Sequence, residues 1–132
     1  MPSFSERSHA ALSTCHPELR RLFYEVIRHW DCTVLEGVRS EEQQAENVRR
    51  GVSKTLASKH LKQPDGWAHA VDVAPFPVDW QDTERFRAFG GFVLGVAAIM
   101  GVPIRWGGDW DGDRTFKDES FVDLPHFELR VS

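Results

Sequence analysis

The sequence predicts a single α+β domain in which about three main helices pack against a small antiparallel sheet. Apolar residues recur with the period of a helix in three long stretches, and shorter stretches rich in β-branched residues lie between and after them. The 132 residues contain no linker, internal repeat or low-complexity tract that would divide the chain. We therefore interpret residues 1–132 as one domain, long enough to bury a hydrophobic core of its own.

The N-terminal part of the chain predicts two helices followed by a strand. A short helix is expected over 5–13. A longer amphipathic helix is expected from Pro17, which suits the first helical position, to Trp30, with Asp31 ending it. The core-facing residues of this helix are Leu19, Leu22, Phe23, Val26, Ile27 and Trp30. Residues 33–36 then predict a strand.

A turn and a second main helix are expected next. Residues 37–40 contain the turn, and Ser40 with Gln43 three residues later forms a capping-box pattern. Gly51 is a residue type that commonly ends helices. The second helix is therefore expected between Ser40 and Gly51.

The second half of the chain predicts further strands and the third main helix. Residues 69–74 alternate and are rich in small and β-branched side chains, which predicts a strand with His69 and Asp72 on opposite faces. Asp72 needs an explanation there, because a buried carboxylate is costly unless it is paired or bound to a metal. A long helix capped by Asp82 or Thr83 is expected next. It runs through Met100, and further strands are expected over 104–106 and 127–131.

The loop between the last two expected strands, 107–121, carries an alternating acidic pattern. Asp109, Asp111 and Asp113 follow one another as Asp-x-Asp-x-Asp, which could bind calcium. The twelfth position counted from Asp109 is Ser120, where a complete EF-hand loop needs a bidentate Glu. We therefore interpret these residues as a solvated turn, with calcium as the open alternative.

Composition and charge exclude several classes of partner. The net charge of -4 offers no basic surplus, so no nucleic-acid partner is expected. The longest apolar run, 92–100, is too short to span a bilayer, so no membrane insertion is expected. The N-terminus lacks the apolar core of a signal peptide. Cys15 and Cys32 have no ligand spacing and are expected to be reduced, although a single disulfide stays open.

Two polar stretches carry residues that could form a metal site. His60 precedes the strand that contains Asp72, and His126 enters the last expected strand. Together these residues could hold one metal ion, and three protein ligands with an open position are typical of catalytic zinc. Asp123 could act as a base on a water bound to that metal, if Pro125 keeps the turn to His126 compact. The helical His-Glu-x-x-His motif is absent, so that class of zinc protease is not supported.

These motifs resemble those of the zinc peptidases of bacterial cell walls. That group includes the D-alanyl-D-alanine carboxypeptidases and dipeptidases of vancomycin resistance, and the likeness is greater to the phage-endolysin L-alanyl-D-glutamate endopeptidases. The matching segments are 58–60, 69–72 and 123–128 of the metal motif, and His16-Pro17-Glu18-Leu19, Glu36-Gly37-Val38-Arg39-Ser40 with Gln43, Gly51-Val52-Ser53-Lys54-Thr55 and Arg105-Trp106-Gly107-Gly108-Asp109-Trp110. The likeness keeps the family order and covers nearly the whole chain.

The resemblance implies a fold and a division of roles. The fold would be that of the hedgehog and D-alanyl-D-alanine peptidase group, and the activity would be hydrolysis of the L-alanyl-D-glutamate bond in the stem peptide of peptidoglycan. One zinc ion (Zn2+) would be held by His60, Asp72 and His126. Asp123 would be the general base, and Arg39 would lie beside the scissile carbonyl. Residues expected to contact the substrate or the metal ligands are Ser58, His69, Asp109 and Glu128.

Simpler or different interpretations remain beside this one. Arg39 could only pair with Glu36, and His69 could be an ordinary strand histidine. His16, with His9 and His29, has no ligand spacing and is interpreted as structural. The alternative functions are a D-alanyl-D-alanine carboxypeptidase or dipeptidase on the same fold, and a non-catalytic module that binds the cell wall.

The resemblance also suggests where the protein acts. It implies a phage lysis enzyme that accumulates in the host cytoplasm and reaches the wall after another protein opens the membrane. We expect this enzyme to be a monomer. The insert 61–68 makes the loop between two of the expected ligands longer than is common in the family. We expect this insert to shape one wall of the substrate cleft.

Overall fold

The computed structural model describes residues 2–53, 55–112 and 122–130, which contain four helices and four strands. In chain order these are α1 (Glu6–Leu12), α2 (Pro17–Val26), β1 (Cys32–Glu36), α3 (Glu41–Arg49), β2 (Ala70–Pro75), α4 (Thr83–Met100), β3 (Ile104–Trp106) and β4 (His126–Leu129). The α+β class and the small antiparallel sheet are confirmed. Lys54, Asp113, the expected loop at 114–121 and Val131 lie outside the described residues.

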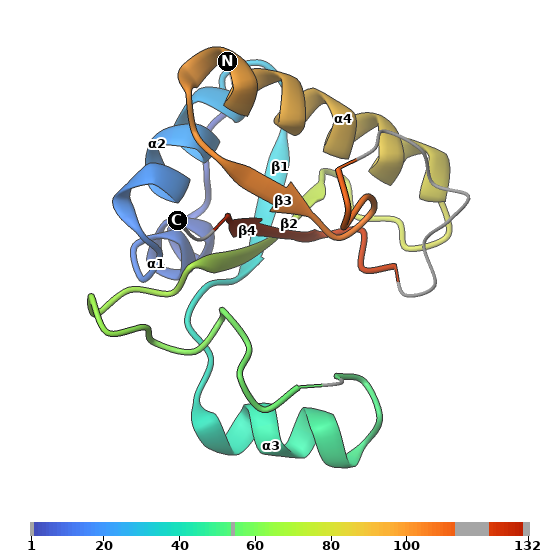
Figure 1. Cartoon of the computed structure of the whole chain (residues 1–132). Helices are drawn as coiled ribbons and strands as arrows, with labels where there is room; N and C mark the ends of the chain where they lie inside the picture. Colours follow the sequence, from blue (N-terminus) through green and yellow to red (C-terminus); the bar gives the residue numbers. More distant parts are fainter. Residues whose placement is uncertain (1, 54, 113–121, 131–132) are drawn as a thin grey trace.

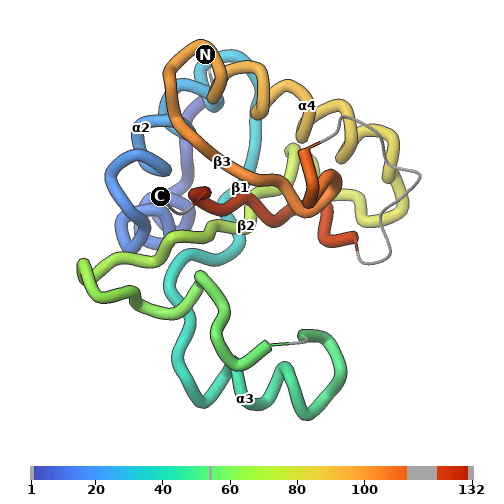
Figure 2. Tube along the Cα trace, viewed as in Figure 1, coloured from blue at the N-terminus to red at the C-terminus, as the bar shows by residue number. Residues whose placement is uncertain are grey.

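The sheet has the strand order β1-β2-β4-β3, and each neighbouring pair is antiparallel. The register of β2 and β4 places Asp72 directly opposite His126. α4 runs along one side of the sheet, where it contacts β2, β3 and α2 (Figure 1). α3 lies apart from this body, beyond two connecting segments, as Figure 2 shows for the chain trace. The pairing of β2 with β4 therefore brings two of the candidate ligands, Asp72 and His126, side by side.

Aromatic side chains form the centre of the core around Phe127 of β4. Its ring packs edge-on against Phe23 of α2, with 5.4 Å between centroids, and edge-on against Phe89 of α4 at 6.3 Å. The Trp106 ring stacks on it at 6.4 Å. All four side chains are buried. The core therefore holds in place the strand that begins with His126.

Gly90 is the point at which α4 meets the Trp106 ring. A Cβ atom at Gly90 would lie 2.2 Å from Trp106 Cζ2, whereas one at Gly91 would meet no atom within 4 Å. We expect Gly90→Ala to lower the free energy of unfolding by about 1–3 kcal/mol through overpacking. Gly91→Ala is the matched control, expected to be neutral or stabilising by up to about 1 kcal/mol because alanine favours a helix. Chemical denaturation measures both variants, and equal stabilities would contradict this close packing.

α2 ends at Val26, earlier than the expected end at Trp30. The amides of Arg28 and His29 bond to carbonyls three residues back, so the chain tightens into a turn. Trp30 keeps a core position because its ring packs against Phe89 of α4, with 5.5 Å between centroids. Periodicity therefore correctly identified Trp30 as a residue that packs against the core, where it is partly buried, and wrongly placed it in the helix. The other expected elements are confirmed, with end shifts that are ordinary for such boundaries.

Two expectations drawn from composition can be compared with the described residues. No helix among them is long and apolar enough to cross a membrane. Cys15 and Cys32 are free thiols, as expected, and burial raises the pKa of each to about 12. Both thiols are therefore protonated and weakly nucleophilic.

Candidate metal centre

Three side chains converge at the end of the central strand pair. His60 Nε2 lies 3.1 Å from Asp72 Oδ1 and 3.2 Å from His126 Nδ1, and the last two atoms are 3.3 Å apart. Asp72 and His126 come from facing positions on β2 and β4, and His60 comes from the segment before β2. Both histidines are buried. The expected ligands therefore form one compact group of donor atoms.

The spacing of these atoms fits a zinc-sized ion. Zinc binds nitrogen and oxygen at about 2.0–2.1 Å in a tetrahedron, which separates the ligand atoms by about 3.3 Å. The three observed separations, 3.1, 3.2 and 3.3 Å, are close to that value. Two imidazoles and one carboxylate also suit zinc better than calcium or magnesium, which prefer oxygen ligands.

His60 is oriented by a backbone carbonyl. Its Nδ1 lies 2.8 Å from the carbonyl oxygen of Gly37, which can only accept, so Nδ1 carries the proton. Nε2 is then left with its lone pair directed at Asp72 and His126. The Ser58 hydroxyl accepts from the His60 amide at 3.1 Å. This arrangement presets the tautomer that a metal ligand needs.

His126 is oriented by a carboxylate. Its Nε2 donates to Glu128 Oε1 at 2.8 Å, so its Nδ1 faces the other two candidate ligands. Glu128 in turn accepts from Arg105 at 2.8 Å and lies 3.5 Å from the Lys59 ammonium. Burial opposes ionisation of Glu128, but the bonds from His126 and Arg105 lower its pKa to about 2. The ionised carboxylate therefore supplies the outer partner that histidine ligands generally have.

Asp123 lies beside the three donors without joining them. Its Oδ2 is 4.0 Å from His126 Nδ1, and its side chain is half-buried. The His126 amide bonds to the Asp123 carbonyl at 3.1 Å, which closes the compact turn that the sequence suggested. Burial, and next the negative charge of Asp72, raises the pKa of Asp123. A carboxylate with a raised pKa next to a metal site is well suited to accept a proton.

Arg39 lies at the edge of this group. Its guanidinium bonds to Glu36 and donates to Gln44 Oε1 at 2.6 Å, and its Nη2 lies 4.0 Å from Asp72 Oδ2. The pairing with Glu36 that the simpler interpretation expected is therefore present. The Arg39 side chain is nevertheless only 12% exposed. Its two partners hold a positive charge beside the candidate ligands.

A cavity of about 520 Å³ opens over the centre. The candidate ligands, Asp123, Arg39 and Ser58 all line it, together with Lys59, Arg105, Trp110 and Glu128. Its lining includes 57–60 but no residue of the insert 61–68. The end of the insert lies against the segment before α2, where Ala68 pairs with backbone atoms of Thr14 and His16, and Leu61 at its start pairs with Arg39. The expectation that it forms a wall of the cleft is therefore wrong for this cavity.

Two of the residues expected at the site lie elsewhere. His69 precedes β2 and directs its Nε2 at Asp65 Oδ2, 2.6 Å away. Asp109 is buried and lines a different cavity, beside Trp106 and Val102. The alternation of the strand explains His69, since it faces away from Asp72.

Four groups that contribute to the site were not identified from the sequence. They are the Gly37 carbonyl, Gln44, Lys59 and Arg105. Lys59 and Arg105 lie within segments that carry the family resemblance, so the resemblance could have pointed to them. Their contacts with Glu128 could not be predicted from the sequence. The role of the Gly37 carbonyl could not be predicted from residue types, because every residue has a backbone carbonyl.

The fold and the site define an α+β domain with a candidate histidine-carboxylate metal centre in an open cleft, an arrangement that suits a peptidase domain. A family model described as "Phage L-alanyl-D-glutamate peptidase" matches residues 2–130. The chain therefore belongs to this family.

Individual proteins show the same likeness. The L-alanyl-D-glutamate peptidase of Escherichia phage T5 is 30% identical over 138 residues, which cover 96% of this chain and 96% of that protein. The enzyme of the same name from Listeria phage A118 is 34% identical over 96 residues, which cover 73% of this chain and 29% of that protein. The crystal structure of the Serratia marcescens L-Ala D-Glu endopeptidase ChiX superposes with a TM-score of 0.76 at 32% identity, covering 98% of this chain and 91% of that chain.

Proposed function

We propose that the protein is a zinc-dependent endopeptidase that hydrolyses the L-alanyl-D-glutamate bond in the stem peptide of peptidoglycan. The observation that carries the proposal is the group of three donor atoms on His60, Asp72 and His126, spaced for zinc, with Asp123 beside it. The family and the named activities of the phage relatives support the choice of bond.

Zinc, Asp123 and Arg39 have separate roles in this proposal. Bound zinc would polarise the scissile carbonyl and make water acidic enough to attack at neutral pH. Asp123 takes a proton from the attacking water and passes it to the amine of D-glutamate as the carbon–nitrogen bond breaks. Arg39, held by Glu36 and Gln44, stabilises negative charge that develops on the carbonyl oxygen.

The remaining expected residues have supporting roles or none in the centre. Ser58 positions the backbone of His60, and Glu128 holds the His126 ring. His69 bonds to Asp65, and Asp109 lines a different cavity, so we assign neither residue a part in the hydrolysis.

Glu128→Gln tests the support of His126. Loss of the negative charge is expected to lower zinc affinity by about 10–100-fold, because the carboxylate fixes the tautomer and raises the basicity of the ring. Competition with a zinc-binding dye measures the affinity. Glu18→Gln is the matched control, since Glu18 pairs with Arg21 on the exposed face of α2. Equal affinities for the two variants would contradict the role of Glu128.

The scissile bond can be identified from the products. Incubation with purified wall fragments is expected to release new ends that carry C-terminal L-alanine and N-terminal D-glutamate, identified by mass spectrometry. His60→Ala, which removes one proposed ligand, is the inactive control. Free D-alanine as the sole product would instead support the carboxypeptidase alternative, and wall binding without cleavage would support the non-catalytic module.

The partner and place of action follow from the same proposal. The phage relatives support a lysis enzyme whose partner is the stem peptide. We propose that it acts as a monomer and stays in the host cytoplasm until another protein opens the membrane.

A further inference from the structure

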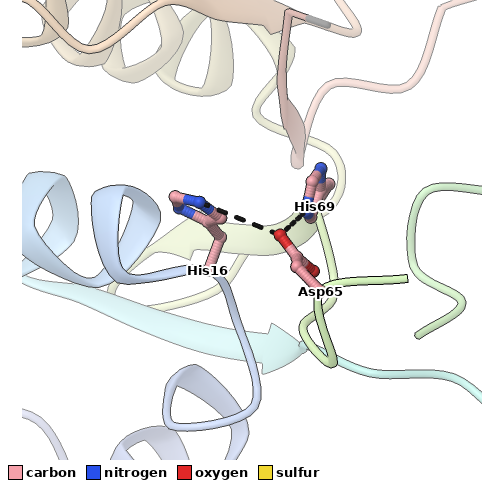
Figure 3. A group of neighbouring side chains, drawn as sticks. All are labelled: His16, Asp65 and His69. Atoms are coloured by element: carbon pink, nitrogen blue, oxygen red, sulfur yellow. Dashed lines mark hydrogen bonds and ion pairs between the residues drawn. The ribbon is translucent and has the colours of Figure 1, made fainter. Parts of the chain in front are cut away.

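A second group of possible metal ligands lies outside the cleft. Asp65 of the insert stands between the imidazoles of His16 and His69, and both rings face the same carboxylate oxygen (Figure 3). Asp65 Oδ2 is 2.6 Å from His69 Nε2 and 4.0 Å from His16 Nε2. One ligand atom from each residue lies within 4.8 Å of the other two. The donor set, two imidazoles and one carboxylate, is the same as in the cleft.

Hydrogen bonds hold the backbone of His16 and of His69 and the side chain of Asp65. The His16 amide bonds to the Ala68 carbonyl at 2.9 Å, and the His69 amide bonds to the Lys59 carbonyl at 2.8 Å. Asp65 sits in a turn in which its Oδ1 accepts from the Trp67 amide at 3.0 Å. Because Oδ1 is occupied by this turn, Oδ2 is the atom presented to the histidines. The fold therefore brings the three residues together at the surface, where Asp65 is exposed and the two histidines are partly buried.

The proton positions differ from those in the cleft. His16 Nδ1 accepts from the Glu18 amide at 3.0 Å, as the cap of α2, so in the neutral ring the proton is on Nε2. A metal on Nε2 would move that proton to Nδ1, and the Glu18 amide would lose its acceptor. His60 and His126 need no such rearrangement, because their outer nitrogens already donate. Binding at the second group must therefore be weaker.

We propose that His16, Asp65 and His69 form a second, weaker site for a divalent transition metal, with zinc as the ion. Imidazole and carboxylate donors favour zinc, copper, nickel and cobalt over calcium and magnesium. Because the outer nitrogen of His16 accepts a hydrogen bond where a metal-bound ring must donate one, we expect an affinity about 10–100-fold below that of the cleft site. An ion here joins the start of α2, the insert and the residue before β2. It fixes the insert 61–68 to the domain, next to the Arg20–Trp67 contact, in which the guanidinium carbon lies 4.7 Å from the ring centroid.

Zinc stoichiometry tests this site. Metal-free protein is dialysed against increasing concentrations of free Zn2+, and the zinc bound per chain is measured by elemental mass spectrometry. The wild type is expected to take up one equivalent tightly and a second at about 10–100-fold higher free zinc. Asp65→Asn keeps the Oδ1 acceptor for Trp67, and His69→Gln removes one imidazole; each is expected to lose the second equivalent only. His29→Gln is the matched control, because His29 also pairs with a carboxylate, Glu25 Oε2 at 2.7 Å.

The outcomes separate this site from the proposed active centre. His60→Ala is expected to lose the tight equivalent and keep the weak one, whatever its activity on wall fragments. Thermal unfolding of the metal-free variants checks that Asp65→Asn and His69→Gln are folded. A wild type that saturates at one equivalent would overturn the second site. So would a second equivalent that persists in both Asp65→Asn and His69→Gln.

Discussion

Asp123→Asn is expected to lower kcat/KM on stem-peptide substrates by about 10²–10⁴-fold while the cleft keeps its zinc. The amide has the shape of the carboxylate but cannot accept the proton of the attacking water. The metal should stay, because Asp123 Oδ2 is 4.0 Å from His126 Nδ1 and lies outside the group of three donors. Activity assays and zinc analysis of the same preparation measure the two effects together.

Two further variants serve as controls for Asp123→Asn. Asp79→Asn changes an exposed aspartate in the turn before α4 and should leave kcat/KM unchanged. His60→Ala should lose both the tight zinc and the activity, because it removes a proposed ligand. Loss of the tight zinc in Asp123→Asn would show that Asp123 is a ligand, and unchanged activity would show that it is not the base.

Gly107→Ala is expected to reduce kcat/KM by about 10²-fold, although residue 107 is neither a ligand nor the base. A Cβ atom there would lie 2.0 Å from the carbonyl oxygen of Asp123, which is backbone and cannot rotate away. The same glycine accepts from the Asp123 amide at 2.9 Å and donates to the His126 carbonyl at 2.8 Å. Any shift that makes room must therefore move the turn that carries both the proposed base, Asp123, and a proposed ligand, His126.

The comparison for this variant is Gly95→Ala on α4, where an added Cβ meets no atom within 4 Å. It should keep full activity. Steady-state kinetics with wall fragments and a zinc titration of both variants measure the effect. Wild-type kinetics for Gly107→Ala would show that the turn adjusts without displacing Asp123, and that this close approach is not needed for the geometry of the site.

The sequence by itself determined which residues could form the centre. Donor atoms belong to residue types, so His60, Asp72, His126 and Asp123 could be selected before their positions were known. Asp72 was identified as a candidate ligand because it lies within a predicted strand, where burial of an unpaired charge is costly. Local periodicity likewise predicted most helices and strands, since neighbouring residues decide it.

Only the tertiary structure decided how those atoms face one another. The Gly37 carbonyl selects the tautomer of His60, and Glu128 selects that of His126. Strand register places Asp72 opposite His126 and turns His69 to the other face, where it meets Asp65. These contacts join atoms from different segments, and packing and backbone hydrogen bonds form them. A pattern within one segment records the residue type and its local period, and does not contain the partner that the folded chain brings to it.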